Sequence, residues 1–169
     1  MTRRGLIIGL AASTMLAACQ PTPPPFPGEA TGVLREIQDL VHAFVRLKND
    51  FASIPGLAFN KVQYVKGAIE QMGVLIISVV DTATETSKRA AEQILGLVQG
   101  VLDQVASLAV NTPVSILVSA AITLIPIIAR QFGITIPPVP PQVAAYEAHY
   151  PHYDQEQADQ AVASLAYSG

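Results

Sequence analysis

One stretch of this chain without a charged side chain, Val114–Ala129, restricts the folds that it can adopt. A helix that is apolar on every side belongs either at the centre of a helix bundle or in a lipid bilayer. The Thr112-Pro113 pair before the stretch favours a helix start, and Gly133 after it favours a helix end. We therefore expect one apolar helix over Pro113–Phe132.

Length, polarity and charge favour burial of this helix in protein. Its apolar part is at the short end of what spans a bilayer, and it includes the helix-kinking Pro126 and the hydroxyls of Ser119 and Thr123. A single span would also place the acidic C-terminal segment in the cytoplasm, although that segment has no Lys or Arg after Arg130. We expect a buried central helix, and a membrane-spanning or interfacial helix stays open as an alternative.

Three amphipathic helices are expected before the apolar one. In residues 33–54, apolar side chains alternate at spacings of four and three, the heptad pattern of packed or coiled-coil helices. The residues of this first stripe are Val33, Ile37, Leu40, Phe44, Leu47, Phe51 and Ile54. A second helix opens near Asn60, with Gln63 placed to complete a capping box. Such stripes can pack within one chain or against a second copy.

The second helix becomes apolar on nearly every side in Met72–Val80. We expect it to break there, with Thr82 as the N-cap of a third helix and Glu85 returning the capping bond. One unbroken helix from residue 60 to 110 is the alternative. Within the third helix, Gly96 and Gly100 have the small-xxx-small spacing of closely packed helices and are candidate packing residues.

Beyond the apolar helix, residues 134–169 are expected to form a Pro-rich strap followed by an acidic tail. Asp154 and Gln157 are placed to cap a short final helix. This helix would bear Ala158, Ala161, Val162 and Leu165, and we expect it to be marginal or mobile.

The first nineteen residues have the organisation of a secretory signal. Basic residues in Met1–Arg4 precede an apolar segment, Gly5–Met15, that is too short to span a bilayer. Leu16-Ala17-Ala18-Cys19 follows, and it resembles the lipobox of bacterial lipoproteins, in which Leu and two small residues precede an acylated cysteine. Cys19 is the only cysteine in the chain, so no intramolecular disulfide can form.

The resemblance implies a cellular location and a membrane anchor. In lipoproteins of this kind, the sulfur of the cysteine corresponding to Cys19 receives diacylglycerol, a type II signal peptidase cuts before it, and the new amino group is acylated, for example with palmitate. Two or three acyl chains hold a protein on a membrane durably. Gln20 stands where Asp would signal inner-membrane retention, which implies the outer membrane, facing the periplasm. Residues 19–29 then form a lipidated Pro-rich tether.

Recognisable chemistry is sparse in the sequence. The net charge is −3, so no basic surface for nucleic acid is expected. His149, His152 and Asp154 are metal ligands by type, but their spacing beside Pro151 is not that of a zinc helix, and we expect no metal or other cofactor there. No nucleophile motif or phosphate-binding loop occurs, so we expect no catalytic residues.

The sequence thus predicts an all-α protein, a small bundle of amphipathic helices around one apolar helix. We expect a signal peptide over residues 1–18, the tether over 19–29, the bundle over 30–133, and the strap and tail over 134–169. The predicted function is that of an acyl-anchored, non-catalytic envelope lipoprotein that acts through helix packing with protein partners or itself. A membrane-inserting or pore-forming protein and a carrier of apolar ligands are the alternatives.

Overall fold

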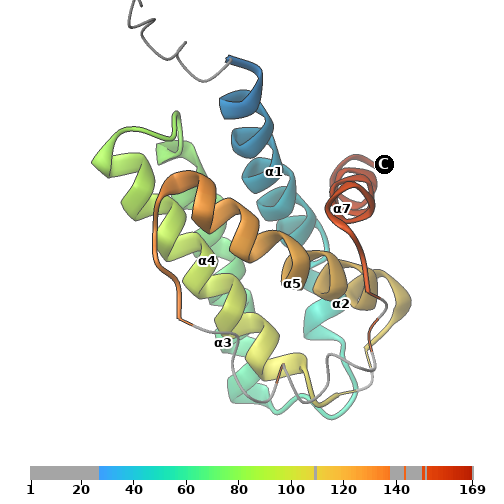
Figure 1. Cartoon of the computed structure of the whole chain (residues 1–169). Helices are drawn as coiled ribbons and strands as arrows, with labels where there is room; N and C mark the ends of the chain where they lie inside the picture. Colours follow the sequence, from blue (N-terminus) through green and yellow to red (C-terminus); the bar gives the residue numbers. More distant parts are fainter. Residues whose placement is uncertain (1–26, 109, 138–142, 144–149, 151, 169) are drawn as a thin grey trace, which may run out of the picture.

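The computed structural model describes residues 27–108, 110–137, 143, 150 and 152–168, with the side chains described from residue 32 onward. These residues form helices and no strand, which confirms the predicted all-α class (Figure 1). The elements are α1 (Pro27–Arg46), α2 (Lys48–Ala52), α3 (Phe59–Leu75), the 3₁₀ turn η1 (Ile76–Ser78), α4 (Glu85–Val105), α5 (Thr112–Phe132) and α7 (Gln155–Tyr167). The expected signal peptide and most of the tether lie outside the described residues, and Pro27 to Glu29 belong to α1.

The heptad stripe of residues 33–54 is buried along its whole length, as the sequence predicts. It runs from α1 into α2, where the rings of Phe44 and Phe51 stack with their centroids 5.4 Å apart. Helices α3 and α5 pack against α1, and α2 packs against α3. The stripe is therefore covered by helices of the same chain.

The chain breaks between α3 and α4, as expected, but the caps differ from those predicted. Thr84, not Thr82, is the N-cap of α4, and its hydroxyl accepts a hydrogen bond from the Ser87 N–H at 3.3 Å. The reason is Asp81, whose Oδ1 accepts from the N–H groups of Ala83 and Thr84 at 2.8 and 2.7 Å and so shapes the turn.

The capping box expected at the start of α3 is also absent. Helix α3 begins after Ala58, without a hydrogen bond from a side chain at its N-cap. The predicted cap residue, Asn60, therefore lies within the first turn of the helix.

The apolar helix α5 packs against α1, α4 and α7, so the expected buried central helix is observed (Figure 1). It is long and apolar enough to cross a membrane, yet 56% of its most apolar window is buried inside the bundle. Asn111, rather than Thr112, is its N-cap and accepts from the Val114 N–H at 3.1 Å. Gly133 ends the helix as predicted, with a φ of 64°, and α5 continues through Pro126.

Helix α7 has the predicted capping box. The Asp154 carboxylate accepts from the Gln157 N–H at 2.8 Å, and the Gln157 side chain accepts from the Asp154 N–H at 3.1 Å. The expectation of a marginal tail is corrected, because α7 packs along both α1 and α5 and buries Ala158 and Val162. The bundle therefore extends beyond residue 133 and includes the final helix.

Three side chains fasten the C-terminal part of the chain to the bundle. The Gln99 amide donates to the Pro137 carbonyl at 3.0 Å, and the Thr123 hydroxyl of α5 donates to the Tyr153 carbonyl at 3.0 Å. The Tyr150 hydroxyl donates to the Ala106 carbonyl at 3.3 Å. These bonds tie Pro137, Tyr150 and Tyr153, which lie between α5 and α7 in the chain, to helices of the bundle or their ends.

The corrected cap of α4 gives a direct test of this fold. Replacing Thr84 by Ala removes the acceptor for the Ser87 N–H and is expected to lower the free energy of unfolding by about 1 kcal/mol. Thr82→Ala is the matched control, because Thr82 caps no helix, and it should change stability much less. Denaturant titrations measure both variants, and an equal loss in the two would contradict the assigned cap.

Candidate functional site

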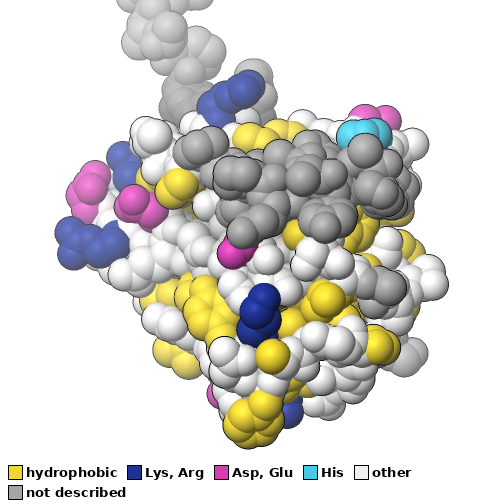
Figure 2. Space-filling view, turned by 90° about the horizontal axis from the view of Figure 1, so that it is seen from below, with side chains coloured by type: hydrophobic (Ala, Val, Ile, Leu, Met, Phe, Trp, Pro, Cys, Tyr) yellow, Lys and Arg dark blue, Asp and Glu magenta, His cyan; other side chains and the backbone are white. Residues whose placement is uncertain are grey.

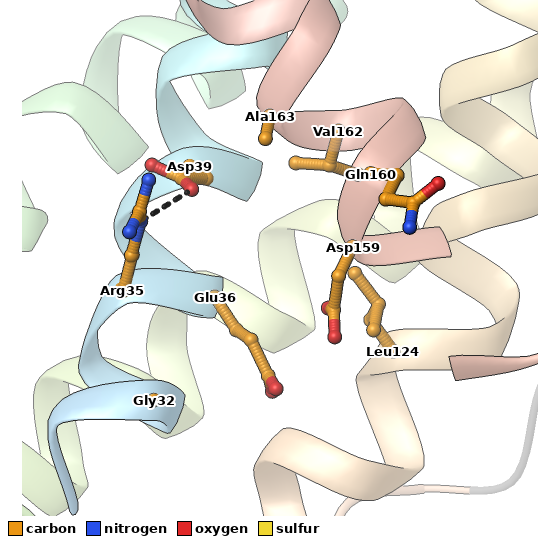
Figure 3. Close-up of a pocket in the computed structure, with 9 residues that line it drawn as sticks. All are labelled: Gly32, Arg35, Glu36, Asp39, Leu124, Asp159, Gln160, Val162 and Ala163. Carbon is orange, nitrogen blue, oxygen red and sulfur yellow. Dashed lines mark ion pairs between the residues drawn. The ribbon is translucent and has the colours of Figure 1, made fainter. Parts of the chain in front are cut away.

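An open cleft of about 310 Å³ between α1 and α7 is the most chemically distinctive place on the described surface (Figure 3). Leu124 of α5 contributes to its lining, so three helices meet there. The remaining lining residues are Gly32, Arg35, Glu36 and Asp39 from α1 and Asp159, Gln160, Val162 and Ala163 from α7. Three carboxyl groups thus line a cleft whose other walls are largely apolar.

Asp39 is the best-satisfied carboxylate of the three. It is only 5% exposed, and its Oδ1 accepts a hydrogen bond from the Tyr167 hydroxyl at 2.6 Å. Its Oδ2 lies 3.5 Å from Nε of Arg35, one helical turn away. The Tyr167 ring also meets His42 edge-on, with centroids 6.3 Å apart. These contacts join the end of α7 to the middle of α1.

Glu36 and Asp159 are less well satisfied. They extend from α1 and α7 into the same space (Figure 3). The Gln155 amide donates to Glu36 Oε1 at 3.2 Å. Glu36 Oε2 and Asp159 Oδ1 are both buried and make no hydrogen bond in the described part of the chain. Docking α7 on α1 therefore brings two carboxyl groups together without a neutralising base between them.

The environment shifts the titration of these groups. Burial, and then the charge of Asp159, raises the pKa of Glu36 above its ordinary value. Burial, and then the charge of Asp39, raises the pKa of Asp159. The hydrogen bond to Asp39 raises the pKa of Tyr167, because the protonated phenol is the donor. The site therefore favours retention of protons at both ends of α7.

This arrangement favours the protonated forms of two facing carboxyl groups. A carboxyl group with a raised pKa in a cleft is a known signature of functional sites, and structural clusters of like charge produce the same shift. Among the residues that the structure describes, no three His, Cys, Asp or Glu side chains are placed to hold a metal ion. The geometry thus supports a helix contact whose stability falls as pH rises.

The structure treats the two glycines predicted to pack helices differently. Gly100 lies against the hydroxyl of Tyr64 from α3, so a side chain at this position would collide with the tyrosine. Gly96 is exposed, and no atom of the described residues lies within 4 Å of the place a Cβ would take. Close packing therefore involves Gly100, whereas Gly96 faces outward.

The remaining predicted site residues lie largely outside the described part of the chain. Cys19 and the Leu16-Ala17-Ala18 motif are among these, as is His149. Of the other two candidate metal ligands, His152 is exposed and Asp154 serves as the N-cap of α7. The carboxylate of Asp154 therefore has a structural role at the start of α7.

The acidic cleft was not predicted from the sequence. By its spacing Asp39 lies on the polar face of α1, away from the heptad stripe, so the pattern gives no sign that it is buried. The available signal was the stripe formed by Ala158 and Val162, which implies that α7 covers some helix. Which helix it covers depends on the path of residues 134–154, and no local pattern encodes that path.

Comparison with known proteins adds no family to these observations. No family model matches the chain, and no curated protein or solved structure matches it. Function is therefore inferred from this chain's own residues.

The facing carboxyl groups predict a specific dependence of stability on pH. Since folding raises the pKa of Glu36 and Asp159, the folded state binds more protons, and stability falls as pH rises from the ordinary values of 4.5 and 3.8 through the raised ones. Asp159→Asn removes one of the two charges. It should increase the free energy of unfolding at pH 7 by about 0.5 kcal/mol, a small gain because both groups remain partly solvated.

The matched control is Glu92→Gln, which removes an exposed negative charge from α4, away from this cleft. Thermal unfolding between pH 4 and 7 measures both variants. The stability difference between Asp159→Asn and the unmodified protein should grow with pH, whereas that of Glu92→Gln should stay nearly flat. A pH-independent difference for Asp159→Asn would show that α7 does not hold the two carboxyl groups together.

Proposed function

We propose that this chain is an acyl-anchored, non-catalytic lipoprotein of a bacterial envelope that acts as a structural or assembly module. The observation that carries the proposal is Cys19, the only cysteine, which directly follows Leu16-Ala17-Ala18 and a basic-then-apolar leader. Each buried methylene of an acyl chain contributes about 0.8 kcal/mol, so the two or three chains expected at Cys19 suffice for a durable anchor.

The packing of the body supports an anchored, rather than inserted, protein. The apolar helix α5, whose residues 114–129 carry no charge, is covered by α1, α4 and α7, and Leu117, Leu124 and Ile128 are fully buried. Moving α5 into lipid would expose the faces of three helices that now cover it. In this proposal the acyl group does the anchoring and the bundle stays outside the hydrocarbon.

The proposed cellular location and partners follow from the sequence. Gln20 in place of an acidic retention signal favours the outer membrane, with the bundle facing the periplasm. A chain with a net charge of −3 offers no attraction to nucleic acid, so protein partners and the membrane are its expected contacts.

Membrane insertion is the second candidate, and one observation favours it. Val74, Ile77 and Val80 are exposed at the end of α3, inside the segment expected to be apolar on nearly every side. A carrier of apolar ligands is less well supported, because the cleft between α1 and α7 presents three carboxyl groups to any occupant.

Substitution of the cysteine tests the anchor. Cys19→Ser removes the acylated sulfur and is expected to abolish incorporation of labelled palmitate and to release the protein from the membrane fraction. Gln20→Asp is the matched control, since it should keep the palmitate while moving the protein toward the inner membrane. Cys19→Ser protein that resists carbonate washing would instead support insertion of α5.

A further inference from the structure

Three aliphatic side chains at the end of α3 are largely exposed to solvent and are not packed into the described part of the bundle. Val74 is 68% exposed, Ile77 is 77% exposed and Val80 is 69% exposed. They occupy the last turn of α3, η1 and the residues just after it, and we call residues 74–80 the aliphatic turn. Between Ile77 and Val80, Val79 is only 2% exposed and belongs to the core, so the turn has one side facing inward and one facing outward.

A buried polar side chain fixes the shape of the aliphatic turn. The Ser87 hydroxyl accepts from the N–H groups of Val80 and Asp81 at 3.2 and 3.4 Å and donates to the Ser78 carbonyl at 3.1 Å. Ser87 is fully buried in the first turn of α4. These hydrogen bonds hold the backbone of the turn in place, and its exposed aliphatic side chains point away from the core. A partner that binds them would therefore need to order little additional backbone, which keeps the entropy cost of binding small.

The aliphatic turn lies at the end of the molecule from which the anchor would approach. Figure 1 shows the turn between α3 and α4 at the same end of the bundle as the start of α1. Eight residues lead from Cys19 to Pro27, and even a fully extended chain of this length spans only about 28 Å. An acylated Cys19 would therefore hold this end of the bundle close to the bilayer.

We propose that Val74, Ile77 and Val80 contact the surface of the phospholipid bilayer, which gives the anchored protein a second attachment and a fixed orientation. The inference rests on the proposed acylation of Cys19. Aliphatic side chains at a held surface leave water for the acyl-chain boundary, and burial of each contributes about tenfold in partition.

The charges that follow the turn set the depth of this contact. The carboxylate of Asp81 accepts two backbone hydrogen bonds, and those bonds lower its pKa and keep it ionised. An ion pair follows in the first turn of α4, where Nζ of Lys88 lies 3.5 Å from Oε1 of Glu85. Ionised groups of this kind stay among lipid headgroups, so the contact is interfacial and α3 does not enter the hydrocarbon.

The opposite end of the bundle supplies the control. Figure 2 shows that end from below, with apolar side chains exposed between isolated charged ones. Phe59, the first residue of α3, is 78% exposed and so matches Ile77, in the turn that follows α3, in exposure. The length of α3, 17 residues or about 25 Å, separates it from the aliphatic turn.

The test uses the acylated protein in vesicles of phosphatidylethanolamine and phosphatidylglycerol. Because Cys19 would be blocked by lipid, Ile77→Cys and Phe59→Cys each provide one thiol for an environment-sensitive fluorophore. Quenching by spin-labelled lipids then reports depth. We expect the label at residue 77 to be quenched by lipids labelled near the headgroup and shifted to the blue, and the label at residue 59 to be quenched at least several-fold less.

Each other outcome overturns the inference in an identifiable way. Acylated protein with equal quenching at both positions, or with none at residue 77, contradicts the bilayer contact while leaving the anchor intact. A blue shift at residue 77 that appears without vesicles and grows with protein concentration assigns the turn to a second copy. If mass spectrometry finds no acyl chain on Cys19, the proposed function falls together with this inference. Circular dichroism of both variants confirms that they are folded.

Discussion

The packing of α5 against α1, α4 and α7 is the contact on which the rest of this structure depends. The stretch of α5 without charged side chains, residues 114–129, must be covered by other parts of the protein. Each of the three neighbouring helices contributes an apolar face to that cover. The heptad stripe of α1 and α2 and the stripe of α4 are thereby used inside one chain. What the protein can present to partners is consequently limited to side chains outside this core, such as those of the aliphatic turn.

Covering α5 with α7 has an electrostatic cost. The helix brings Ala158 and Val162 onto the α1–α5 surface, but Asp159, between them in sequence, then faces Glu36. Burial of apolar surface outweighs the repulsion of two partly solvated carboxyl groups, whose pKa values rise instead. The contact of the last helix with α1 therefore depends on pH.

The sequence predicted those parts of the fold that local periodicity encodes. The buried stripe from Val33 to Ile54, the break after α3, the end of α5 at Gly133 and the capping box at Asp154 are all confirmed. The position of the α4 cap was missed, because Asp81 shapes the turn through two backbone bonds that shift the helix start to Glu85.

The candidate site was less accessible to prediction. The burial of Asp39 and the pairing of Glu36 with Asp159 arise only when α7 crosses α1, and their spacing in the chain carries no trace of that contact. The anchor motif at Cys19 can be recognised from the sequence alone. Because it lies outside the described residues, it stays a prediction.

The central claim is that α5 is held by protein and not by lipid, and amide hydrogen exchange tests it most directly. In Cys19→Ser protein kept free of detergent, the amides around Leu117 and Leu124 should exchange only through global unfolding, at rates unchanged by added vesicles. Rapid exchange in buffer that becomes slow only when vesicles or detergent are added would contradict the account and assign α5 to the membrane.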